Sequence, residues 1–128
     1  MNAPRLRIEP LGSAKREEDG WRTTWRVANA EQYAVRVVGA IAPHTHFRGE
    51  ASLDREIRGK GSTQFPLVVL TPGARGEIEN AFLILLVEQG DVRWRVITRL
   101  RVAVDDEGRP EPRVETVTMQ RVGFSGEL

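Results

Sequence analysis

The chain has 128 residues, of which 40% are hydrophobic and 29% charged, with a net charge of +1 and no cysteine. This length fits one domain spanning residues 1–128, which buries roughly two-thirds of its unfolded-chain surface and needs no cross-links. The composition excludes disulfides, thiolate metal sites and cysteine nucleophiles, and the small net charge gives no overall attraction to nucleic acid or anionic membranes.

Apolar runs in the chain are short. The longest covers residues 81–87, too short to cross a bilayer as a helix, and residues 1–20 contain no apolar run of signal-peptide length. Disulfides are common in small secreted domains, so the lack of cysteine favours a reducing compartment. We therefore expect a cytoplasmic protein with no membrane partner.

Segments rich in Val, Ile, Thr and Trp alternate with turn signals such as Asp19-Gly20 and Gly90-Asp91. Several short strands with regular turns are typical of a β-sandwich or barrel. No window has a capped helical stripe, and the best helical candidate, 50–57, fits an edge strand equally well. The predicted strands are 5–11, 21–28, 33–41, 53–58, 64–70, 78–88, 92–104 and 114–124.

Side-chain direction follows from period-two alternation within these strands. Gly39 suggests a bulge or a close backbone approach, and Pro66 favours an edge strand. Residues 108–112 are interpreted as a connection between sheets. The side chains expected in the core include Trp21, Trp25, Val27, Val35, Val37 and Ile41.

The clearest strand is 92–104, which reads VRWRVITRLRVAV. Its alternation predicts one buried face, with Trp94 inside, and places arginines on the other face roughly 6 to 7 Å apart. Gly90-Asp91 suits a two-residue hairpin turn to the preceding strand. The resulting outer pairs are Glu88–Arg93, Leu86–Arg95, Ile84–Ile97, Phe82–Arg99 and Asn80–Arg101, and the core pairs are Val87–Trp94, Leu85–Val96, Leu83–Thr98 and Ala81–Leu100.

The outer face of this hairpin mixes apolar side chains with arginines. Arginine stems, a neighbouring strand or the loop near His44 are expected to cover part of it. The alternatives are a partner surface, because aromatic residues and arginine are enriched in interfaces, or a different register. The predicted interface residues are Phe82, Ile84, Leu86, Arg93, Arg95, Ile97, Arg99 and Arg101.

His44 and His46 form the chain's only histidine pair and are its only metal-ligand candidates. On a strand, residues i and i+2 point to the same side, so both rings would face one metal ion. A third ligand would be Glu50 or Asp54. The default interpretation is a histidine-containing loop with no metal.

Other chemistry is not indicated by the sequence. Residues 59–63 (GKGST) are followed by a strand pattern, whereas a phosphate loop requires a helix. No serine sits in a nucleophile elbow, and acidic pairs such as Asp105-Asp106 fall in turns. The arginine row has only Phe82 for base stacking, so nucleic acid is an alternative rather than the expected partner. We expect no catalytic residue and no cofactor.

The run 21–86 resembles bacterial immunoglobulin-like or fibronectin-like β-sandwiches. In those domains a strand ends in Asn before a turn, and a later Leu-x-Pro-Gly precedes a strand. Asn29 and Leu70-Thr71-Pro72-Gly73 occupy these places. The resemblance implies an immunoglobulin-like antiparallel sandwich of about 7–8 strands acting in recognition or as a scaffold. We therefore expect a non-catalytic protein-interaction or assembly module, self-associating through the sheet face, with metal or small-ligand binding and nucleic-acid binding as alternatives.

Overall fold

The computed structural model describes residues 2–122, which form eight β-strands and no helix. The prediction of an all-β sandwich is therefore confirmed. The strands are β1 (Leu6–Glu17), β2 (Gly20–Asn29), β3 (Val35–His44), β4 (Phe47–Ile57), β5 (Ser62–Val69), β6 (Gly76–Gln89), β7 (Val92–Val104) and β8 (Pro110–Val122).

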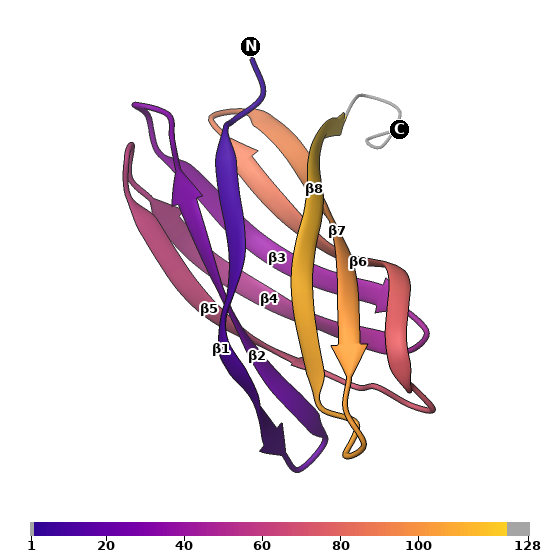
Figure 1. The fold of residues 1–128 in the computed structure, drawn as a ribbon. Coiled ribbons are helices and arrows are strands. Elements are labelled where there is room, and N and C mark those ends of the chain that lie inside the picture. Colours follow the sequence, from indigo (N-terminus) through magenta and orange to yellow (C-terminus); the bar gives the residue numbers. More distant parts are fainter. Residues whose placement is uncertain (1, 123–128) are drawn as a thin grey trace.

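The strands form two antiparallel sheets that pack face to face around one core (Figure 1). The small sheet has the order β1-β2-β5, and the large sheet has the order β4-β3-β6-β7-β8. At one corner the sheets join through an isolated bridge between Arg48 and Leu70. The backbone N–H of Arg48 donates to the Leu70 carbonyl at 3.0 Å, and the N–H of Leu70 donates to the Arg48 carbonyl at 2.8 Å.

The alternation in β2 produces the inward face predicted for it, with Trp21, Trp25 and Val27 all buried. Thr23 also faces inward, where its hydroxyl donates to the Leu67 carbonyl and accepts the Trp25 indole N–H, both at 2.8 Å. These bonds satisfy two polar groups that would be costly to bury alone. β5, which contains Pro66, pairs only with β2 along its length, so it is the edge strand that the proline predicted.

The hairpin formed by β6 and β7 has the predicted register from Glu88–Arg93 to Ala81–Leu100. Gly90 adopts the positive φ of 58° that the turn requires. Trp94 is 7% exposed and points inward, whereas Arg95 and Arg99 are exposed. The two-sided interpretation of this ribbon is therefore confirmed.

A bulge overturns the last predicted pair, Asn80–Arg101. The register shifts between Ile78 and Ala81, and Asn80 takes a φ of 58°. Two residues of β6 therefore face one residue of β7 at this point, which removes Asn80 from direct pairing with Arg101.

A second bulge, between Val37 and Gly39, corrects the direction predicted for Ile41. The extra residue reverses the alternation, so Ala40 and Ala42 are buried and Ile41 lies half-buried on the outer face. Gly39 itself was correctly interpreted as a bulge and close approach, because a Cβ there would lie 3.3 Å from the Leu86 Cδ1.

Strand boundaries account for the remaining differences. The segment 108–112 does not cross between sheets, because β8 already begins at Pro110 and pairs with β7 as a hairpin. The segment 50–57 lies entirely within β4 and is not a helix. Residues 123 and 124, predicted to end the last strand, lie outside the described residues.

Candidate interaction surface

The outer face of the large sheet has no second layer over it within residues 2–122, because all eight strands belong to the two packed sheets (Figure 1). The sequence predicts that other parts of the chain cover part of this face. Within the described residues, the only cover comes from neighbouring side chains on the same face. Three isoleucines stand side by side in one register row across β3, β6 and β7. They are Ile41, Ile84 and Ile97, all half-buried.

Arginine stems flank this row on β7. Arg95 pairs with Leu86 on one side of the row, and Arg99 pairs with Phe82 on the other. The long aliphatic stems of arginine cover apolar neighbours while the guanidinium reaches water. The structure therefore brings together the predicted apolar residues Phe82, Ile84, Leu86 and Ile97 into one strip beside Arg95 and Arg99.

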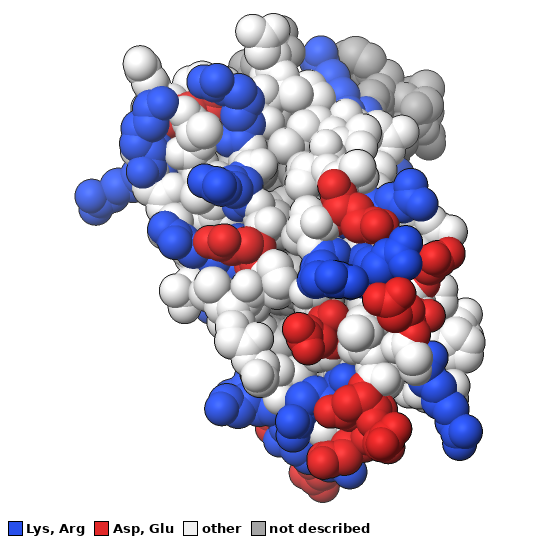
Figure 2. All heavy atoms as spheres, viewed as in Figure 1, with Lys and Arg blue, Asp and Glu red and all other residues white. Residues whose placement is uncertain are grey.

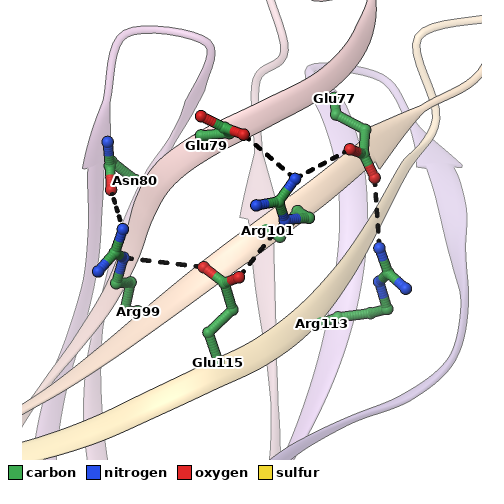
Figure 3. A network of polar contacts seen from close by, with 7 residues as sticks. All are labelled: Glu77, Glu79, Asn80, Arg99, Arg101, Arg113 and Glu115. Carbon is green, nitrogen blue, oxygen red and sulfur yellow. Dashed lines mark hydrogen bonds and ion pairs between the residues drawn. The ribbon is translucent and has the colours of Figure 1, made fainter.

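A network of ion pairs lies at one end of the strip, across β6, β7 and β8 (Figure 3). Arg101 is its centre, with Nη1 at 3.1 Å from Glu77 Oε2 and 3.2 Å from Glu79 Oε1, and Nε at 3.4 Å from Glu115 Oε2. Hydrogen bonds to Glu77 and then to Glu115 raise the pKa of Arg101 above its ordinary value. The network is extended by Arg99, Asn80 and Arg113.

The bulge in β6 explains how this network forms. Because Asn80 and Glu79 together oppose one residue of β7, Glu79 reaches Arg101 while the Asn80 Oδ1 accepts a 2.6 Å hydrogen bond from the Arg99 Nη2. Sequence alternation alone paired Asn80 with Arg101. The sequence feature that indicates a bulge here is the Glu79-Asn80 pair, because Asn tolerates positive φ better than most residues.

Ion pairs also occupy the opposite end of the strip. Arg93 Nε lies 3.4 Å from Glu88 Oε2, and Arg36 pairs with Asp54 and Glu56. The hydrogen bond to Asp54 is the main reason that the pKa of Arg36 is raised. Over β7 and β8 in Figure 2, positive and negative atoms alternate instead of forming separate patches.

Arg95 differs from the other predicted arginines, because it makes no ion pair within residues 2–122. It borders a hollow of about 420 Å³ whose apolar walls include Val38, Leu86 and Val122. An unpaired guanidinium beside an apolar wall is suited to contact with a partner that supplies both a carboxylate and apolar area.

The ion pairs bear directly on the nucleic-acid alternative. Phosphate binding uses guanidinium groups free to neutralise the backbone charge. Arg93, Arg99 and Arg101 are each held by carboxylates of the same chain. This arrangement does not favour a phosphate-binding row.

The predicted geometry of the His44–His46 pair is wrong. Thr45 and His46 form the turn between β3 and β4, so the two histidines are not i and i+2 residues of one strand. The His44 Nδ1 accepts the backbone N–H of His46 at 3.0 Å, and the His46 Nδ1 lies 2.7 Å from the Pro72 carbonyl. Within residues 2–122 no three His, Asp or Glu side chains are grouped as a metal site, and neither Glu50 nor Asp54 completes one.

The remaining sequence candidates lie in turns. Residues 58–61 connect β4 to β5, so the GKGST segment leads into a strand as expected. Lys60 has a φ of 64°, and its Nζ donates to the Ala30 carbonyl at 2.6 Å. The Asp105 carboxylate accepts the backbone N–H groups of Glu107 and Arg109, both at 2.9 Å, which is a turn-capping role.

One part of the surface was missed by sequence reasoning. Val68 and Leu70 are 41% and 40% exposed, and they line a groove with Ile41 and Pro43 where the two sheets join. The only sequence signal was the alternation of β5, which places Val68 on the outer face opposite Val69. The meeting of β5 with β3 and β4 is a tertiary contact that no local pattern specifies.

Comparison with known proteins gives no relative. No family model matches the chain, and no curated protein or solved structure resembles it significantly. Within residues 2–122 we also find no helix with the length and apolar character needed to span a bilayer.

Proposed function

We propose that this protein is a protein-interaction or assembly module that associates with itself through the outer face of its large sheet. The observation that carries this proposal is the row Ile41–Ile84–Ile97, which lies on a sheet face over which no other described strand packs. Apolar patches rimmed by polar groups on a folded domain are typical of interaction sites.

The arrangement of charge supports the same function. The strip has an apolar centre, and ion pairs stand at both ends, around Arg101 and around Arg36 and Arg93. Stable interfaces have this layout, with an apolar core surrounded by a polar rim. Because the charges at the two ends of the strip are paired within the chain and Arg95 alone among the predicted arginines is unpaired within residues 2–122, the surface carries no strong single-sign field that would require an oppositely charged partner.

An immunoglobulin-like or fibronectin-like kinship is part of this proposal. Two antiparallel sheets of three and five strands are compatible with that architecture, and the Leu70-Thr71-Pro72-Gly73 segment leads into β6 as the resemblance implies. Such sandwiches commonly serve in recognition, although the fold by itself does not determine function.

The experiment is sedimentation velocity over a wide range of protein concentrations, comparing the wild-type chain with Ile97→Glu. A buried carboxylate at the centre of an apolar interface is costly, so Ile97→Glu should shift the chain to monomer. The matched control is Gln64→Glu, because Gln64 is a polar, exposed residue on β5 of the small sheet, away from the proposed contact. Circular dichroism verifies that both variants fold.

Loss of association in Ile97→Glu alone supports the proposal. If the wild type and both variants form the same oligomer, the contact lies elsewhere on the molecule. A wild-type chain that stays monomeric at high concentration would reject self-association.

A further inference from the structure

A groove lies at the corner where the two sheets join, with a volume of about 470 Å³. Its apolar walls are Val68 and Leu70 from β5 and its connection, and Ile41 and Pro43 from β3. Ile41 pairs with Ile84, so the groove is continuous with the isoleucine row of the sheet face. The apolar surface therefore extends around the edge of the sandwich.

Backbone contacts hold β4 and β5 together at this corner. A Cβ at position 49 would lie 2.2 Å from the Val68 carbonyl oxygen, so only glycine lets β4 and β5 approach this closely. The adjacent bridge between Arg48 and Leu70 fixes the two strands by hydrogen bonds in both directions. The groove is thus built on fixed backbone.

Three charged residues line the groove: Asp19 from the turn between β1 and β2, and Arg48 and Glu50, which carry opposite charges on β4. Arg48 lies opposite Pro43 and Glu50 lies opposite Ile41, and both side chains are exposed. Within residues 2–122 neither makes an ion pair, although most charges around the sheet face do. Because they are two residues apart on one strand, they lie on the same side of β4.

We infer that this groove is part of the contact between two copies of the chain, in which Arg48 of each copy pairs with Glu50 of the second copy. The inference rests on the proposed function and specifies its partner and orientation. A two-fold axis between positions 48 and 50 brings each charge opposite its counterpart, so the charged edge is complementary to itself.

The test measures the dimer dissociation constant by sedimentation velocity for the full chain and for Arg48→Glu and Glu50→Arg. Each single variant places like charges opposite each other in the dimer, so each should weaken association by about tenfold or more. In an equal mixture of the two variants, a chain with carboxylates at both positions meets a chain with guanidinium groups at both. The mixture should therefore associate about as tightly as the wild type.

Matched controls carry the same charge changes on the opposite edge of the large sheet. Arg121→Glu and Glu111→Arg alter exposed residues of β8 that make no ion pair within residues 2–122, and they should leave the dissociation constant within about twofold of the wild type. Both primary substitutions replace exposed side chains and leave the backbone bridge at position 48 intact. The fold is checked in each case by circular dichroism.

The outcomes separate this inference from the proposed function. If Ile97→Glu breaks the dimer but the charge variants and their mixture match the controls, the sheet face is the contact and the inferred pairing is wrong. If the wild-type chain is monomeric throughout, both the pairing and self-association are rejected. If neither single variant dimerises well but their mixture dimerises about as tightly as the wild type, the reciprocal pairing of Arg48 with Glu50 is established.

Discussion

Ile84 and Ile97 lie directly opposite each other on the outer face of the large sheet, while their chain neighbours Leu85 and Val96 lie opposite each other in the core. The same hairpin therefore presents an apolar row to each side. The turn at Gly90 determines which row is inside, because a slip of one residue would exchange the two faces. One apolar row is needed for folding, and the other is available for contact.

Leu85 and Leu86 provide a direct test of this two-sided arrangement. Leu85 is fully buried and Leu86 is half-buried on the outer face. Leu85→Ala should lower the free energy of unfolding by about 2–5 kcal/mol, because it leaves a cavity in the core. Leu86→Ala should cost less than about 1.5 kcal/mol, because the truncated side chain borders solvent. Urea denaturation measures both values, and similar losses would contradict the assignment of faces.

The sequence was most informative where alternation was long and uninterrupted. The direction of Trp94 and the hairpin pairs from Glu88–Arg93 to Ala81–Leu100 followed from period two and one turn. Prediction failed at the bulges, because an inserted residue reverses the alternation without changing composition. That is why Ile41 was assigned to the core, and why its place in the outer row was found only in the structure.

The corner groove could not be predicted from the sequence, for a different reason. It depends on Val68 meeting the turn end of β3 and the start of β4, which are distant along the chain. Gly49 is the residue that permits this approach, yet a glycine within a strand does not indicate which strand comes near it. Pairing among surface charges is equally non-local, so the difference between Arg101 and Arg48 in ion pairing was not predictable.

Thr23 and Thr98 are both buried threonines, and they differ in whether the side-chain hydroxyl is hydrogen-bonded. Thr23 bonds to the Leu67 carbonyl and the Trp25 indole, whereas the Thr98 hydroxyl has no partner in the part of the chain that the structure describes. Thr23→Val should reduce the free energy of unfolding by about 1–3 kcal/mol, since two polar groups lose their partner. Thr98→Val should be neutral or stabilising by about 1 kcal/mol. Thermal and urea unfolding compare the two, and a large loss for Thr98→Val would mean that its hydroxyl is satisfied.

Arg101 holds three carboxylates, from Glu77, Glu79 and Glu115. Arg101→Gln should leave these acids close together without their cation, and their mutual repulsion should lower the melting temperature at low salt. The difference from the wild type should shrink as ionic strength approaches about 1 M, where screening acts over about 3 Å. Calorimetry across a salt series measures this. Arg121→Gln, on an exposed arginine without such partners among residues 2–122, is the control, and a salt-independent loss would argue against an electrostatic origin.

Gly49→Ala tests whether the corner between the sheets depends on the absence of a side chain. The new Cβ would stand 2.2 Å from the Val68 carbonyl oxygen and 3.3 Å from the Val69 Cγ1, so the strands must separate. Such overpacking should cost about 1–3 kcal/mol of unfolding free energy. Hydrogen exchange should accelerate at the Arg48 and Leu70 amides, which form the bridge.

The control for this change is Ser52→Ala, an exposed position on the same strand where the free energy of unfolding should stay within about 0.5 kcal/mol of the wild type. Because separation of the strands would also widen the groove, Gly49→Ala should weaken self-association even at temperatures where the chain remains folded. Unchanged exchange at both amides would mean that the corner accommodates a methyl group, and the groove would then not owe its shape to Gly49.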